Sequence, residues 1–351
     1  MIFILAIFLL LLFVKAKYRH LDEVDDYLSK DYTTCISGVF AVLVLFGHFG
    51  DYIDIPSLNI FDSISINLTS GLGQLVVVPF LFFSGYGLLE QIKSRGDKYV
   101  KSLPKNRILR LYLMFLFAWL LFLIVSLSMQ KPYNPAHYAW SVIGFTSIGN
   151  SNWYVVVILA LYTSTFLSYL IFKDQRVALI SNIILIVGLY VVLMVWGMPH
   201  HWYDTVLGYA TGLAYSFFKD KILLFYKKVK GGRLILLLAS IALTGGFGVL
   251  NIYFPHDVFF AMMVISFANI FPALLALFKI RNKFYLIVGQ YTFWIYILQR
   301  IPMIIFHEVP EISGIIHLYL FIVMAVTAVL AFAVDKAFNF TWSILNPKKS
   351  K

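Results

Sequence analysis

Long apolar runs, separated by short polar segments, account for most of this chain. The runs lie at residues 2–14, 33–52, 71–90, 111–129, 153–172, 177–196, 205–218, 234–254, 258–278, 284–301 and 314–334. Most of them approach the ~20 residues that an α-helix needs to cross a bilayer. Their apolar character is continuous rather than alternating, which excludes the strands of an outer-membrane barrel. We therefore expect an all-α integral membrane protein, a polytopic helical bundle of about ten core spans plus one N-terminal span.

The amino-acid composition supports a membrane protein and argues against several other classes of protein. Hydrophobic residues make up 61% of the 351 residues and charged residues 13%, whereas a soluble domain is about one quarter charged. The net charge of +11 is spread among the loops between apolar runs, as topology control requires, so we expect no nucleic-acid partner. The single cysteine, Cys35, excludes an intrachain disulfide and a cysteine-based metal site, and we expect no metal.

The first apolar run predicts a membrane anchor. No basic residue precedes it and no small-x-small cleavage site follows it, so an uncleaved anchor with its N-terminus outside fits better than a signal peptide. The charged segment after it predicts an amphipathic cytoplasmic connector. The expected organisation is an anchor and connector at 1–32, a multi-span domain at 33–335 and a basic cytoplasmic tail at 336–351.

The basic residues predict which side of the membrane each loop faces. If the first run enters the cytoplasm, the expected cytoplasmic segments hold 26 of the 28 lysines and arginines, and the other two are Lys131 and Arg300. Such a one-sided distribution is the pattern that sets helix orientation. It predicts eleven spans with the C-terminus in the cytoplasm. The segments counted are 15–32, 91–110, 173–176, 219–233, 279–283 and 335–351.

One histidine stands out in the stretch TTCISGVFAVLVLFGHFGDYID, residues 33–54. His48 lies near the end of an apolar run, where an ionisable group is a functional candidate by default. The alternative is a boundary histidine that only hydrogen-bonds a neighbour. Ser37 precedes it by eleven residues, about three turns and ~16 Å, so the two share nearly one helix face. Asp51 or Asp54 could orient the ring, and Asp51 at i+3 is better placed.

A basic cluster leads into the run at 111–129. Within KYVKSLPKNRILR, residues 98–110, Arg107 and Arg110 are i, i+3 neighbours and are expected to share one helix face. Two guanidiniums at the membrane surface can clamp phosphates bidentately. The alternative is that the cluster serves only the positive-inside rule.

A third stretch, PFLFFSGYG at residues 79–87, combines proline, Ser84 and two glycines within one apolar run. Such residues interrupt a helix, let helices approach closely, or free carbonyl groups for a ligand. A substrate-channel wall and simple helix packing account for it equally well.

The expected outside loops differ in chemistry from the inside ones. They fit an aromatic belt at the interface, and also a carbohydrate acceptor, because rings stack on sugars and carboxylates accept hydroxyl hydrogen bonds. The residues concerned are His137, Tyr138, Trp140, His200, His201, Trp202, Asp204, Glu308 and Glu311.

Taken in order, these stretches resemble the motifs of the membrane acyltransferase-3 family. ISGVFAVLVLFGH, residues 36–48, resembles a motif of an arginine, ten residues and a histidine, except that Ser37 stands in place of the arginine. FLFFSG, residues 80–85, resembles an aromatic signature of the family, and Arg107 and Arg110 resemble its RxxR pair.

Two later stretches extend the resemblance. NWYVVVILALY, residues 152–162, is similar to a Trp-led span of the family, and GQYTFWIYILQRIP, residues 289–302, to a later motif. In that motif Thr292 replaces a serine and Gln299 replaces a histidine. The similarity covers about residues 33–335.

Members of this family O-acetylate or otherwise O-acylate bacterial surface polysaccharides. The resemblance therefore implies a multi-pass O-acyltransferase of the bacterial plasma membrane. It implies transfer of an acyl group, expected to be acetyl, from cytoplasmic acyl-CoA to a hydroxyl of a cell-surface or lipid-linked glycan. Whether the chain forms a homodimer is left open.

The resemblance also implies roles for individual residues. His48 would act as the general base on the acceptor hydroxyl, or carry the acyl group briefly, with Asp51 orienting it. Arg107 and Arg110 would hold the donor phosphates, and Ser37 leaves one cationic contact absent or supplied by another residue. Substrate contacts are expected from Ser84, Asn152, Trp153, Tyr296 and Gln299.

A transporter or flippase of glycan intermediates is the competing hypothesis. It would also have many spans, a central polar site and a basic cytoplasmic face. Transporters commonly show inverted repeats with broken helices in matching halves, and the sequence shows no such symmetry. A purely structural scaffold would give His48 and the arginine pair no functional role.

Overall fold

The computed structural model describes residues 1–53 and 59–346. It is 83% helical with almost no strand. Within the described residues, eight helical segments are long and apolar enough to cross a membrane. The expected class, an all-α membrane protein, is confirmed. The eight segments are Lys30–Tyr52, Ile60–Arg95, Asp97–Ser128, Asn152–Ile171, Gln175–Val195, Gly232–Tyr253, Asp257–Leu277 and Ile316–Leu345.

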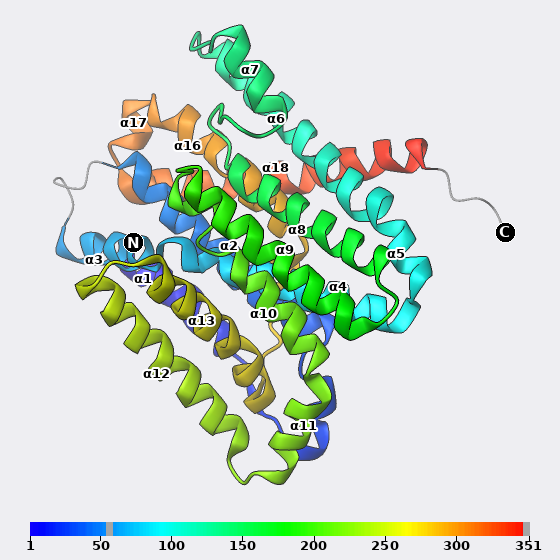
Figure 1. Ribbon diagram of the computed structural model, residues 1–351. Coiled ribbons are helices and arrows are strands. Elements are labelled where there is room, and N and C mark those ends of the chain that lie inside the picture. The colour runs from blue at the N-terminus through cyan, green and yellow to red at the C-terminus, as the bar shows by residue number, and fades with distance from the viewer. Residues whose placement is uncertain (54–58, 347–351) are drawn as a thin grey trace.

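The helices follow one another with short connections (Figure 1). The α-helices are α1 (Ile2–Phe13), α2 (Lys30–Phe49), α3 (Ile60–Leu72), α4 (Val78–Arg95), α5 (Asp97–Leu103), α6 (Arg110–Ser128), α7 (Pro135–Val142), α8 (Asn152–Ile171), α9 (Gln175–Val195), α10 (Val206–Phe217), α11 (Lys219–Lys228), α12 (Gly232–Tyr253), α13 (Asp257–Leu277), α14 (Lys283–Gln290), α15 (Thr292–Leu298), α16 (Arg300–His307), α17 (Pro310–Ser313) and α18 (Ile316–Leu345). Short helices of other pitch are η1 (Leu21–Asp26), η2 (Gly50–Tyr52), η4 (Gly73–Val77), η5 (Pro104–Leu109) and η6 (His200–Trp202), and the strands are β1 (Lys17–Tyr18) and β2 (Phe278–Lys279).

Three of the expected spans are not long single helices. α1 and α10 have 12 residues each, fewer than an upright span needs. The run at 284–301 is divided among α14, α15 and α16, which break at Tyr291 and Gln299. The number of spans therefore stays a prediction, as does the side on which each loop lies.

The ends of other expected segments also move. The expected tail at 336–351 begins inside α18, which continues to Leu345. The expected loop at 130–152 contains α7, which projects beyond the rest of the bundle (Figure 1). Proline does not interrupt the run around Ser84, because Pro79 lies in the first turn of α4, where its missing N–H costs no helical hydrogen bond.

Two close helix crossings position the elements around the site. A Cβ built on Gly38 of α2 would lie 2.3 Å from the carbonyl oxygen of Tyr285 in α14. A Cβ on Gly85 of α4 would lie 2.3 Å from the carbonyl oxygen of Tyr209 in α10. Both distances are far below van der Waals contact, so only glycine allows these backbones to meet. The helix-packing interpretation of the stretch around Ser84 is confirmed for Gly85.

We expect Gly85→Ala to destabilise the protein, because the new methyl group forces α4 and α10 apart; overpacking of this kind costs roughly 1–3 kcal/mol. Gly87→Ala, in the same helix, is the matched control, since its Cβ meets nothing within 4 Å and alanine favours the helix. Thermal unfolding in detergent should separate the two variants. Equal melting temperatures would contradict the close crossing.

The segment between α1 and α2 is fixed in place by polar contacts. β1 pairs with β2 in an antiparallel two-stranded sheet. Arg19 is 1% exposed and its Nε donates to the carbonyl oxygen of Leu275 at 3.0 Å. Arg233 donates to the carbonyl oxygen of Arg19 at 2.6 Å. The hydroxyls of Tyr27 and Tyr215 lie 2.8 Å apart. These contacts set where α2 begins, and with it one wall of the site.

Candidate functional site

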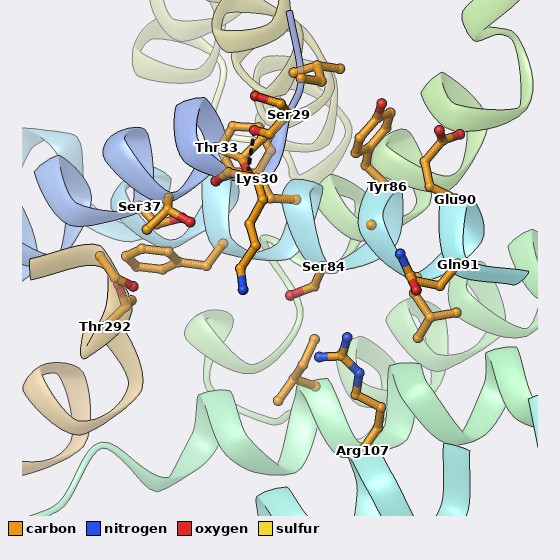
Figure 2. Close-up of a pocket in the computed structure, with 18 of the residues that line it drawn as sticks. Ser29, Lys30, Thr33, Ser37, Ser84, Tyr86, Glu90, Gln91, Arg107 and Thr292 are labelled. Atoms are coloured by element: carbon orange, nitrogen blue, oxygen red, sulfur yellow. Dashed lines mark hydrogen bonds between the residues drawn. The ribbon is translucent and has the colours of Figure 1, made fainter. Parts of the chain in front are cut away.

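A cavity of about 860 Å³ lies between α2, α4, η5, α8 and the α14–α15 break. Figure 2 shows side chains from several of these elements converging on it. Charged groups line the part near the start of α2 and the end of α4, and apolar and aromatic groups line much of the rest. Its lining comprises Asp25, Asp26, Leu28, Ser29, Lys30, Thr33, Thr34, Ser37, Phe80, Phe83, Ser84, Tyr86, Gly87, Leu88, Glu90, Gln91, Arg95, Arg107, Leu111, Tyr154, Ile158, Tyr162, Lys219, Gly289, Thr292, Phe293 and Tyr296.

Arg107 is the basic residue of the expected arginine pair that reaches this cavity. Its Nε donates to the hydroxyl of Tyr99 at 3.3 Å, and its guanidinium projects into the cavity (Figure 2). No carboxylate pairs with it among the described residues. A planar guanidinium in this setting is a ready partner for a phosphate.

Arg110 takes a different direction. Its Nη2 donates to Oδ1 of Asn339 in α18 at 2.8 Å, and its guanidinium lies 5.8 Å from the Trp342 ring centroid. η5, with Arg107 in it, is a π-type helix, whose wider turn changes the angle between residues three apart. The two arginine side chains therefore point in different directions. For both to bind one phosphate group, Arg110 would have to give up its contacts with α18.

The inner part of the cavity is lined by small hydroxyl groups and by aromatic rings. Ser37 of α2, Ser84 of α4 and Thr292 of α15 line it (Figure 2). The rings of Tyr154 and Tyr296 close this region, with centroids 5.1 Å apart. Hydroxyl groups and aromatic rings of this kind suit an uncharged, extended segment of a substrate.

His48 lies next to Tyr296, one side chain beyond the cavity lining. The two ring centroids are 6.3 Å apart. The amide Nε2 of the buried Gln299 lies 2.9 Å from Nδ1 of His48 and also donates to the carbonyl oxygen of Tyr296 at 3.1 Å. An amide nitrogen only donates, so Nδ1 accepts this hydrogen bond and Nε2 of the neutral ring carries the hydrogen.

Polar groups around His48 are left without partners. Oε1 of Gln299, the hydroxyl of Tyr296 and Nε of Arg300 are buried and have no hydrogen-bond partner among the described residues. Buried polar groups are usually paired, and an exception needs an explanation. Three such groups beside one histidine are the pattern expected where a polar substrate binds.

Asp51 does not contact the histidine ring. Its Oδ2 accepts from Nη2 of Arg300 at 2.7 Å, so Gln299, rather than Asp51, contacts His48. Any effect of Asp51 on His48 passes through Arg300. Asp54, the other candidate for orienting the ring, lies outside the described residues.

A family model described as an acyltransferase domain matches residues 34–336, more than half of the chain. The chain belongs to the membrane acyltransferase-3 family. The match has nearly the bounds expected from the motifs, 33–335, and it establishes a membrane acyltransferase. Neither the curated proteins nor the solved structures gave a significant match.

Four of the expected site residues of this acyltransferase line one cavity: Ser37, Ser84, Arg107 and Tyr296. His48 and Gln299 adjoin it through Tyr296. The structure does not bring Asn152 or Trp153 to the cavity.

Asn152 and Trp153 have other contacts. The Asn152 amide donates to the carbonyl oxygen of Gly144, which holds the loop before α8. The Trp153 ring lies 5.6 Å from the His201 ring. Their neighbour Tyr154 occupies the cavity wall instead, because successive residues of a helix point in different directions.

Sequence reasoning missed three residues of the candidate site. Lys30 lies in the segment predicted as an amphipathic cytoplasmic connector, Tyr154 lies in the motif at 152–162 directly after the expected Asn152 and Trp153, and Arg300 is one of the two exceptions to the charge distribution. The seven-residue spacing from Lys30 to Ser37, two helical turns, was the signal for Lys30.

One group of side chains in the described residues could hold a metal ion. His200, Asp204 and Asp257 place their ligand atoms within 4.8 Å of one another, away from the cavity lining. Burial raises the pKa of Asp204 to about 6, and the carboxylate of Asp257 adds to the shift. The hydroxyl of Tyr203 lies 2.9 Å from Nδ1 of His200, so this nitrogen has a hydrogen-bond partner next to the group.

Proposed function

We propose that this acyltransferase moves an acyl group, acetyl in the first instance, from cytoplasmic acyl-CoA to a hydroxyl of a cell-surface or lipid-linked glycan. The observation that carries the proposal is one continuous cavity of about 860 Å³, which joins a charged mouth to Tyr296 beside His48. A donor with charged phosphates at one end and an acyl thioester at the other matches this gradient of polarity.

The donor would enter from the charged end. Arg107 would hold a phosphate, because its guanidinium reaches the cavity and forms no ion pair among the described residues. The pantetheine arm would pass Ser84 and Ser37 between the aromatic walls. The acyl group would then reach the ring of Tyr296, next to His48.

His48 would act on the acceptor hydroxyl. The acceptor oxygen attacks the thioester carbonyl carbon while its proton passes to the imidazole; the carbon–sulfur bond then breaks, and the departing thiolate takes a proton. The base must present an unprotonated ring nitrogen. In the structure that nitrogen is Nδ1, to which Gln299 donates, so the Gln299 amide would have to give up this hydrogen bond when the acceptor hydroxyl binds.

The acceptor would approach from the opposite end of α2, where Asp51, Arg300 and the unpaired hydroxyl of Tyr296 lie. Sugar hydroxyls hydrogen-bond to such charged and phenolic groups. The catalytic histidine thus stands where a donor from one side of the membrane and an acceptor from the other can meet. The proposed setting is the bacterial plasma membrane, with the C-terminus of the chain in the cytoplasm.

The proposal predicts opposite sides for the two ends of the site. In a Cys35→Ser background, we expect Lys105→Cys and Lys228→Cys to resist an impermeant thiol reagent in intact cells and to react after permeabilisation. Ala136→Cys and Glu311→Cys should react in intact cells. All four positions are exposed, so differences in labelling report the side of the membrane. Labelling of Lys105→Cys from outside would place the donor mouth on the wrong side.

A further inference from the structure

The charged mouth of the cavity holds more positive than negative charge once internal ion pairs are set aside. Lys219 lies 3.4 Å from a carboxylate oxygen of Glu90, which also pairs with Lys93 at 2.7 Å. Asp25 pairs with Lys227 at 2.8 Å. The lining groups that form no ion pair among the described residues are three cations, Lys30, Arg95 and Arg107, and one carboxylate, Asp26.

Two of these cations face the cavity from opposite walls. Lys30 is the first residue of α2, and Arg107 belongs to η5. Figure 2 shows both side chains extending into the space beside Ser84. Arg95 also lines the cavity, and its guanidinium lies 5.9 Å from the Tyr99 ring centroid. Lys30 and Arg107 are therefore the pair best placed to bind one anion between them.

The first turn of α2 adds to the positive potential around Lys30. No side chain caps this turn, so its free N–H groups and the helix dipole favour an anion. The acidic residue in the turn, Asp31, is paired with Arg281 at 2.7 Å. Lys30 itself is held near the cavity because the preceding segment is tied down through Tyr27 and Tyr215.

We propose that Lys30, together with Arg107, forms the binding site for the phosphate groups of the donor. The inference rests on the proposed acyl-CoA donor and names the second cation of its site. Lys30 thereby takes the phosphate-binding role that was predicted for Arg110 from the sequence. The Arg110 side chain contacts α18 instead. The preferred ligand class is a thioester donor with several phosphate groups. Two separated cations bind such a donor more tightly than a thioester without phosphate groups.

Binding to three probes tests this inference: CoA, adenosine 3′,5′-bisphosphate and phosphate-free pantetheine. We expect Lys30→Ala to weaken binding of CoA and of the bisphosphate about tenfold, because one charge-assisted contact is lost. Pantetheine binding should not change. Lys30→Arg should stay within a few-fold of wild type, and Lys30→Ala with Arg107→Ala together should lose about a hundredfold.

Lys105→Ala is the matched control, because Lys105 lies on the same short helix as Arg107 but not in the cavity lining. It should bind all three probes as wild type does. The melting temperature of each variant shows whether it is folded. Calorimetry over a salt series should show a shallower salt dependence for Lys30→Ala, as fewer ionic contacts remain.

The outcomes separate this inference from the function on which it rests. Wild type that binds neither CoA nor the bisphosphate overturns both. Wild type that binds CoA, weakened by Arg107→Ala but not by Lys30→Ala, overturns only the role of Lys30. An equal loss of pantetheine and CoA binding in a folded Lys30→Ala protein also overturns it, since Lys30 would then act on the shape of the cavity.

Discussion

Replacing His48 by alanine is expected to abolish acyl transfer while the protein still inserts and folds. Loss of a general base lowers a rate roughly 10²- to 10⁴-fold. Among the described residues, the side chain that hydrogen-bonds His48 is Gln299, and an amide offers no base in its place. Acylated glycan is measured in membranes alongside protein abundance and melting temperature.

His48→Gln is the informative second variant. It keeps a polar side chain of similar size beside Gln299 but offers no base, so it should be as inactive as His48→Ala. Full acylation at normal abundance in either variant would remove His48 from the mechanism. The histidine would then be a boundary residue that only hydrogen-bonds Gln299.

Arg107→Ala is expected to weaken donor binding by about 10- to 150-fold, the loss of a charge-assisted contact of roughly 1.5–3 kcal/mol. Arg107→Lys should rescue only in part, because a point charge lacks the planar fork of arginine. Arg110→Ala should have a smaller effect on affinity, since Arg110 contacts Asn339 and Trp342 outside the cavity.

Calorimetry with acetyl-CoA on the purified variants in nanodiscs distinguishes these cases. If Arg110→Ala lowers the affinity for acetyl-CoA as much as Arg107→Ala does, the Arg110 side chain must give up its contacts with α18 and bind the donor. The clamp expected from the sequence would then form only with the donor bound. Unchanged affinity in Arg107→Ala would remove the phosphate contact altogether.

The long, uniformly apolar helices could be predicted from the sequence. The runs at 153–172, 177–196, 234–254 and 258–278 begin and end within two residues of α8, α9, α12 and α13. Hydrophobicity alone determines such helices, because a lipid-facing backbone must satisfy its own hydrogen bonds.

The broken segment at 284–301 could not be predicted in the same way. Tyr291 and Gln299, where α14, α15 and α16 break, are not helix breakers. The close approach of α14 to α2 at Gly38 is a tertiary contact, and no local pattern reveals it. The break nevertheless decides the site, since it presents Thr292 and Tyr296 to the cavity.

The candidate site could be predicted only in part, for a related reason. Helical periodicity placed Ser37 and His48 correctly along α2, because α2 is a regular helix. The same periodicity placed Arg107 and Arg110 on one face, and the wider turn of η5 separated them. Contacts between distant segments, such as Gln299 with His48 and Arg300 with Asp51, depend on packing that spacing cannot show.

Transfer of a labelled acyl group tests the central claim most directly. Purified wild type would be reconstituted with lipid-linked glycans from its source membranes and given acetyl-CoA labelled in the acetyl group. The account predicts alkali-labile label in the glycan and an equal amount of free CoA thiol, both absent with His48→Ala. No label and no thiol release, with no affinity for acetyl-, propionyl- or succinyl-CoA but movement of the glycan across vesicles, would contradict it and favour a flippase.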